Sequence, residues 1–183
     1  MNTSQAQPKK LRLAAILPQK RELLAAFCAV ALAVILPQLC HLIGGKPLGN
    51  MLSPMHLPIL FIGLLSGAKA GALAGFAAPL VSFALTGMPP VLSLPYMVVE
   101  LCFYGLTAGI LNGTRLPSLV RLVFAQVAGR VARFLAMGIA LLFFSQTSLS
   151  PVSIFLSVKE GIWGLALQWL LIPPLLFWVK RKK

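Results

Sequence analysis

The chain has 183 residues, of which 58% are hydrophobic and 10% are charged. This composition excludes a water-soluble domain and predicts an integral membrane protein. The formal net charge of +13 would indicate nucleic-acid binding in a soluble domain. Because most basic residues lie between apolar segments, we assign the charge to orientation in the membrane and expect no nucleic-acid partner.

Six apolar runs have about the length that crosses a hydrocarbon core of ~30 Å at ~1.5 Å per residue. They span residues 22–42, 50–66, 70–85, 94–111, 119–144 and 157–179. The connections between them are rich in Gly, Pro, Ser and Thr, which favour turns. The sequence therefore predicts an all-α integral membrane protein whose six-helix transmembrane bundle forms one domain at 22–179. Basic segments at 1–21 and 180–183 flank this domain.

Basic residues gather in alternate connections, and this asymmetry predicts an orientation. One side of the bundle receives Lys9, Lys10, Arg12, Lys20, Arg21, Lys69, Arg115, Arg121, Lys180, Arg181, Lys182 and Lys183. The other side receives Lys46, with Lys159 just inside the last run. Because basic loops stay in the cytoplasm, both termini are predicted to be cytoplasmic. The 1–21 segment is either a solvated tail or a basic amphipathic stretch on anionic membrane lipid.

Small residues recur every fourth position in three rows. The rows are Ala25, Ala29 and Ala33; Gly67, Gly71 and Gly75; and Gly105, Gly109 and Gly113. Such spacing lets helix backbones approach closely inside a membrane. For the glycine rows we favour packing within the bundle. The alanine row has two interpretations, internal packing or a smooth surface for a partner protein.

The fifth run contains the stretch "AGRVARF" at 128–134, which places two arginines deep in the membrane. Counted from Leu119 at ~1.5 Å per residue, Arg130 and Arg133 lie roughly 16 and 21 Å from the inner face. Glu100 lies about 9 Å from the outer end of its own run. A charge at the bilayer centre costs at least ~2.5 to 3.5 kcal/mol and is tolerated when it faces a cavity or a partner.

This polar cluster is the predicted substrate site. Its candidate residues are Arg130, Arg133, Glu100, Tyr96, Tyr104, Glu160, Lys159, Trp163, Gln126 and His56. Arg130, Arg133 and Lys159 exceed Glu100 and Glu160 by one charge, which an anionic group on a solute would balance. The alternative interpretation is a buried ion-pair network that joins the arginines to the two glutamates and only fixes helix packing.

Motifs for catalysis and for ATP binding are missing. The sequence has no G-x-x-x-x-G-K-[ST], H-E-x-x-H or G-x-S-x-G pattern, and it has no clustered Asp or His for metal-assisted hydrolysis. We therefore expect no enzyme, no cofactor and no metal site. A solute-binding transporter subunit that takes its energy from another protein fits better.

Residues 53–111 resemble a known family. They include "SPMHLPILFIGLLSGAKAGALAGFAAPLVSFALTGMPP" and "LPYMVVELCFYGLTAGIL". These runs are similar to the substrate-binding S component of energy-coupling factor (ECF) transporters, the vitamin importers of bacteria and archaea. The resemblance implies a six-helix bundle in the prokaryotic cytoplasmic membrane that captures a vitamin or related micronutrient from outside.

The resemblance also implies partners. These are a transmembrane coupling protein, called the T component, and two cytosolic ATPases. The family's A-x-x-x-A contact motif matches Ala25 and Ala29, with Ala33 one step further, which favours the partner interpretation of that row. Substrate residues are not shared across the family, so the predicted pocket depends on depth and charge alone.

Two other classes of protein remain open. A structural membrane scaffold subunit would pair its buried charges internally and bind no small molecule. A self-sufficient secondary transporter would need no ATPases, although the sequence lacks the inverted repeats that are typical of such carriers.

Overall fold

The computed structural model describes residues 18–143 and 162–181, and every regular element in these ranges is helical. The elements are α2 (Lys20–Leu52), α3 (His56–Ser66), α4 (Ala68–Thr86), α5 (Leu94–Ile110), the short η1 (Leu111–Gly113), α6 (Ser118–Phe143) and α8 (Ile162–Arg181). Five described helices are long and apolar enough to cross a membrane, and α3 is a shorter apolar helix. The prediction of an all-helical protein with several apolar helices long enough to cross a membrane is confirmed for the described residues.

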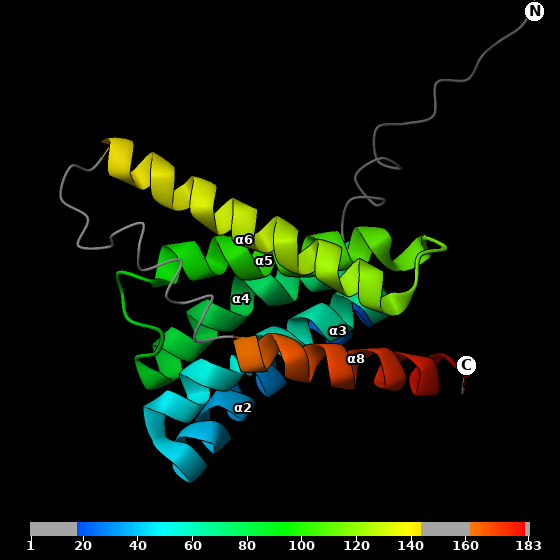
Figure 1. Cartoon of the computed structure of the whole chain (residues 1–183), viewed down its shortest axis with the longest axis horizontal. Coiled ribbons are helices and arrows are strands. Elements are labelled where there is room, and N and C mark those ends of the chain that lie inside the picture. Colours follow the sequence, from blue (N-terminus) through cyan, green and yellow to red (C-terminus); the bar gives the residue numbers. More distant parts are fainter. Residues whose placement is uncertain (1–17, 144–161, 182–183) are drawn as a thin grey trace, which may run out of the picture.

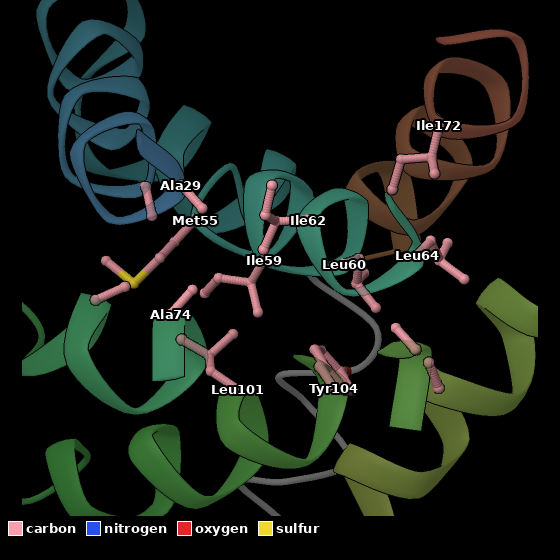
Figure 2. Close-up of a cluster of buried hydrophobic side chains, with 14 of the residues drawn as sticks. Ala29, Met55, Ile59, Leu60, Ile62, Leu64, Ala74, Leu101, Tyr104 and Ile172 are labelled. Carbon is pink, nitrogen blue, oxygen red and sulfur yellow. The ribbon is translucent and has the colours of Figure 1, made fainter. Parts of the chain in front are cut away.

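The helices stack in the order shown in Figure 1. Helices α5 and α6 lie along one side of the molecule, α2 and α8 along the opposite side, and α3 and α4 between them. The apolar core is centred on α3, whose Ile59, Leu60 and Leu64 are fully buried. Figure 2 shows α3 between α2 and α8, with Ile59 and Leu60 directed at α4 and α5. Helix α3 has 11 residues and is about 16 Å long, which makes it shorter than the helices that surround it.

The predicted boundaries of the first two helices are wrong. Helix α2 continues past residue 42, with a break in helical geometry at Gly44 and Gly45, where Gly45 has a φ of 68°. Residues 50–52 therefore belong to α2, and the second helix begins at His56. Ser53 separates the two helices because its left-handed backbone, with a φ of 44°, cannot continue an α-helix. Apolarity alone did not reveal this corner.

Glycines explain how closely α4 and α5 approach. A Cβ atom on Gly105 would overlap the backbone of Gly71, and one on Gly71 would overlap the backbone of Gly105. Gly75 meets the backbone of Leu101 in the same way, and Gly63 of α3 faces the Gly105 carbonyl. These contacts confirm internal packing for Gly71 and Gly75 of the first glycine row and for Gly105 of the second.

Connections at the two ends of the bundle differ in charge. In Figure 1 the α2–α3 and α4–α5 connections lie at one end, and the α5–α6 corner and the end of α8 lie at the other. At the second end, Arg121 Nη1 donates to the Asn112 carbonyl oxygen at 3.0 Å. Lys180 Nζ donates to Asn112 Oδ1 at 2.9 Å. The side chain of Asn112 therefore joins the end of α8 to the α5–α6 corner.

Candidate functional site

Glu100 of α5 is fully buried, and both of its carboxylate oxygens are paired. Arg133 Nη1 donates to Oε2 at 2.7 Å, and Arg130 Nε lies 3.1 Å from Oε1. The Tyr104 hydroxyl donates to Oε1 at 3.0 Å and accepts a hydrogen bond from Arg130 Nε at 2.8 Å. Two arginines of α6 and one tyrosine of α5 thus enclose a single buried carboxylate.

Helical spacing brings these groups together. Glu100 and Tyr104 are four residues apart, and Arg130 and Arg133 are three apart, so each pair projects from one face of its helix. Gly129 completes the fit because a Cβ atom there would overlap the ring of Tyr104. The glycine next to Arg130 therefore gives α5 and α6 the close approach that the ion pairs need.

His56 joins the cluster from the start of α3. Its ring lies 5.3 Å from the ring of Tyr104, centroid to centroid, with the planes tilted by 56°. His56 Nδ1 is 3.1 Å from the Ser53 carbonyl oxygen. Since a carbonyl only accepts, a neutral ring donates through Nδ1 and presents Nε2 as an acceptor.

A cavity of about 460 Å³ adjoins the cluster. Its walls come from α2, α3, α5 and α6 and from the α2–α3 and α4–α5 connections. They comprise Pro37, His41, Gly49, Ser53, Pro54, Met55, His56, Met88, Pro89, Pro90, Ser93, Met97, Glu100, Arg130 and Arg133. The volume falls in the range of about 300 to 1,000 Å³ that is typical of small-molecule sites. The cavity is therefore large enough for a compact organic solute.

The charges that line the cavity do not cancel. Arg130 and Arg133 face one carboxylate, Glu100, so the described wall carries one excess positive charge. Arg133 Nε is buried and has no hydrogen-bond partner among the described residues. A buried donor without an acceptor is costly, and this Nε is the Arg133 donor that Glu100 leaves unused.

The predicted substrate residues divide into three groups. Arg130, Arg133, Glu100 and His56 line the cavity, and Tyr104 supports them from behind. Lys159 and Glu160 lie outside the described residues. The third group, Tyr96, Gln126 and Trp163, does not line the cavity.

Each member of the third group has another environment. Gln126 Nε2 donates to Gln168 Oε1 at 2.8 Å, and Trp169 Nε1 donates to Gln126 Oε1 at 2.7 Å. Gln126 therefore links α6 to α8. Tyr96 is half-buried, and Trp163 is 64% exposed on the surface of α8.

Sequence reasoning missed the apolar part of the cavity wall. Met88, Pro89 and Pro90 belong to the α4–α5 connection, which the sequence marked only as a turn. Met97 is the residue one turn before Glu100 on α5, and this i−3 spacing was a usable signal. His41 lines the cavity just before the break at Gly44 and Gly45, and Gly49 lines it just after the break.

The alanine row of α2 lies mostly inside the subunit. Ala29 and Ala33 are 3% and 0% exposed and belong to the apolar core, whereas Ala25 is only partly buried against it. Internal packing accounts for Ala29 and Ala33 in this structure. The partner role of the row stays a prediction.

Comparison with known protein families supplies one match. Residues 26–178 match the family described as the substrate-specific component of ECF transporters, and these residues include the whole cavity wall. Searches of curated proteins and of solved structures gave no significant match.

Proposed function

The chain belongs to the family of substrate-specific components of ECF transporters, and from this premise we propose that it captures an anionic vitamin or related micronutrient in the cavity beside Glu100. Membership makes the chain a multi-pass membrane subunit of a transporter and not an enzyme. The family also implies an energy-coupling module as its partner. We propose that this module consists of a T component and two cytosolic ATPases.

The observation that carries the proposal is the position of the charge cluster in the cavity wall. Glu100, Arg130 and Arg133 lie within membrane-spanning helices, where an unneeded charge costs at least ~2.5 to 3.5 kcal/mol. One arginine is enough to neutralise Glu100, so the second arginine leaves a positive charge that this carboxylate does not balance. The excess positive charge beside an open volume is the arrangement that an anionic solute requires.

Orientation follows from the two ends of the bundle. Met88, Pro89 and Pro90 place the cavity near the end that holds the α4–α5 connection. Apart from Lys46, the described basic residues outside the cluster gather at the other end: Lys20, Arg21, Lys69, Arg115, Arg121, Lys180 and Arg181. By the positive-inside rule the basic end is cytoplasmic. The cavity then faces the outside of a prokaryotic cytoplasmic membrane, and both termini lie in the cytoplasm.

Of the alanine row, Ala25 is the member that a coupling protein can reach in this conformation. Ala29 and Ala33 are covered by the subunit's own helices. We propose that contact with the T component begins at the cytoplasmic part of α2, next to Ala25.

The experiment is identification of the small molecule that leaves the purified protein on denaturation, by mass spectrometry. The proposal expects a stoichiometric solute from the wild-type protein and its loss from Arg133→Ala. Cellular uptake of that solute should require the T component and the ATPases. Uptake without ATPases would instead identify a self-sufficient secondary transporter.

A structural scaffold is the second candidate, because both arginines do pair with Glu100. A scaffold would release no small molecule. Its Arg133→Ala variant would lose stability without any change in uptake.

A further inference from the structure

The cavity changes character along α5, from apolar near the α4–α5 connection to charged deeper in the bundle. Met88, Pro89 and Pro90 form the connection side of the wall, and Met97 follows on the first turns of α5. Glu100 is six residues after Leu94, the first residue of α5, and so lies about 9 Å into the helix. A ligand that fills the cavity therefore contacts methionine and proline near the α4–α5 connection and the arginine pair deeper in the bundle.

The geometry of Arg133 indicates which ligand group binds at the charged part. Its Nη1 is already used by Glu100 at 2.7 Å, whereas its buried Nε has no partner among the described residues. In a guanidinium, Nη1 lies on the side of Cδ, and the Nε–H and Nη2 donors point together from the opposite edge. That edge matches the two oxygens of a carboxylate, with two parallel hydrogen bonds.

Arg130 plays a different part. Its Nε is directed at the Tyr104 hydroxyl and Glu100 Oε1, at 2.8 and 3.1 Å. The positive charge of Arg130 therefore adds to the charge of the cavity wall, while Tyr104 and Glu100 of α5 hold its side chain in position. Arg133 is thus the residue with an unused binding edge, and Arg130 is a positioning and charge-balancing residue.

The number of charges limits the ligand to one negative group. The described wall holds two guanidinium groups and one carboxylate, so one further negative charge neutralises it. A second carboxylate on the ligand would find no further cation among the described wall residues, which there are mainly methionine and proline with the Ser93 hydroxyl. Methionine side chains are flexible and polarizable, so they adapt to an apolar ring or chain.

We propose that the substrate is an amphipathic monocarboxylate, bound with its carboxylate on the Nε–Nη2 edge of Arg133 and its apolar body against Met55, Met88 and Met97. This inference rests on the proposed function, because it assigns the substrate class of the same cavity. It adds the orientation of the ligand and excludes dicarboxylates, neutral amides and cations.

The test compares four soluble probes of similar shape on the wild-type protein in lipid nanodiscs. The probes are phenylbutyrate, phenylbutanamide, phenylbutylamine and the dicarboxylate phenylsuccinate. Phenylbutyrate alone should raise the melting temperature in a concentration-dependent way. Equal or stronger stabilisation by the amide, the amine or the dicarboxylate would overturn the inference.

Variants then locate the two parts of the ligand. Arg133→Gln should weaken phenylbutyrate binding by roughly ten- to a hundredfold, because charge-assisted hydrogen bonds are lost. Met97→Ala, which leaves the ion pairs intact, should weaken it by a smaller factor. Arg115→Gln is the matched control, since Arg115 is an exposed arginine outside the cavity. Binding that is unaffected by Met97→Ala would contradict the proposed orientation, even if Arg133→Gln fails to fold.

Failure of this inference can be told apart from failure of the proposed function. A neutral, cationic or dianionic solute released from the purified protein would refute the substrate class while supporting solute capture. Absence of any released solute, together with no response to any of the four probes, would refute both.

Discussion

The ring of Tyr104 on α5 occupies the space that a side chain at position 129 of α6 would fill. Gly129 therefore controls whether the Tyr104 hydroxyl reaches Glu100 Oε1 and Arg130 Nε. One missing methyl group on α6 thus sets the geometry of the charge cluster and of the cavity wall beside it.

Gly129→Ala should therefore displace Tyr104 and loosen the cluster. Overpacking of this kind costs about 1–3 kcal/mol, and we expect a lower melting temperature together with weaker solute binding. Gly138→Ala is the matched control on the same helix, because a Cβ atom there meets nothing within 4 Å. That control should be neutral or slightly stabilising, as alanine favours a helix by up to ~1 kcal/mol over glycine. Equal melting temperatures for the two variants would contradict the role of Gly129.

Glu100 and Arg133 should be energetically coupled. Glu100→Gln leaves two guanidinium groups without their carboxylate, and Arg133→Gln leaves Glu100 with Arg130 alone. Each single variant should lower the free energy of unfolding by about 3–5 kcal/mol, the usual cost of breaking a buried ion pair. The double variant should lose less than the sum of the two, because neither Glu100 nor Arg133 is then left without the other, and only Arg130 still loses its carboxylate.

A double-mutant cycle on thermal stability measures this coupling, with and without the released solute. Additive losses would mean that the 2.7 Å contact contributes little to stability. If the folded Arg133→Gln protein retained full solute affinity, Arg133 would have no role in binding.

Part of the charge cluster could be predicted from the sequence alone. Depth along the helices and i to i+3 or i+4 spacing were enough to predict that Glu100, Arg130 and Arg133 meet, because membrane burial forces such groups together. Gln126 lies on the same face of α6, but at its position α6 meets α8 in place of α5, so its partners are Gln168 and Trp169. The periodicity of a sequence shows which residues share one face of a helix. It does not show which neighbouring helix packs against each turn of that face.

The corners were less predictable than the helices. Ser53 ends α2 through a left-handed backbone that no hydropathy pattern encodes, and the apolar wall at Met88 depends on how the α4–α5 connection folds back. Packing of the glycine rows within the bundle was predicted correctly, because small residues at every fourth position let membrane helices approach closely, and the structure shows that the contact joins α4 to α5.

The polar link between α6 and α8 should stabilise the bundle. Gln168→Leu removes the acceptor of Gln126 Nε2 and leaves this buried NH2 group without an acceptor. We expect a loss of about 0.6–1.7 kcal/mol, the range measured for such bonds within membranes. The double variant Gln126→Leu, Gln168→Leu should recover part of that loss, because no buried amide is then stranded and only the partly exposed Trp169 Nε1 loses its acceptor. Thermal unfolding in nanodiscs distinguishes recovery from a further decrease, and a further decrease would contradict this account.

Bulky residues in the alanine row should have different effects at different positions. Ala29→Leu forces a larger side chain into a site that is 3% exposed, so it should lower stability before any effect on partners is seen. Ala25→Leu, at a partly buried site, should leave the melting temperature nearly unchanged and reduce co-purification with the T component and ATPases. Leu42→Phe, at an 82% exposed position far along α2, is the control. Normal assembly of the Ala25→Leu protein would place the partner surface elsewhere.

The orientation of the bundle can be tested by cysteine accessibility. In a background without Cys28, Cys40 and Cys102, a cysteine replaces either Val91 in the α4–α5 connection or Gly113 in η1. Val91 is 66% exposed, and a Cβ atom on Gly113 meets nothing within 4 Å, so neither change should disturb the fold. Since Val91 is near the cavity end and Gly113 is at the basic end, a membrane-impermeant maleimide should label Val91→Cys on intact cells. It should label Gly113→Cys only after permeabilisation. The reversed pattern would place the cavity in the cytoplasm and remove the basis for capture of a solute from outside.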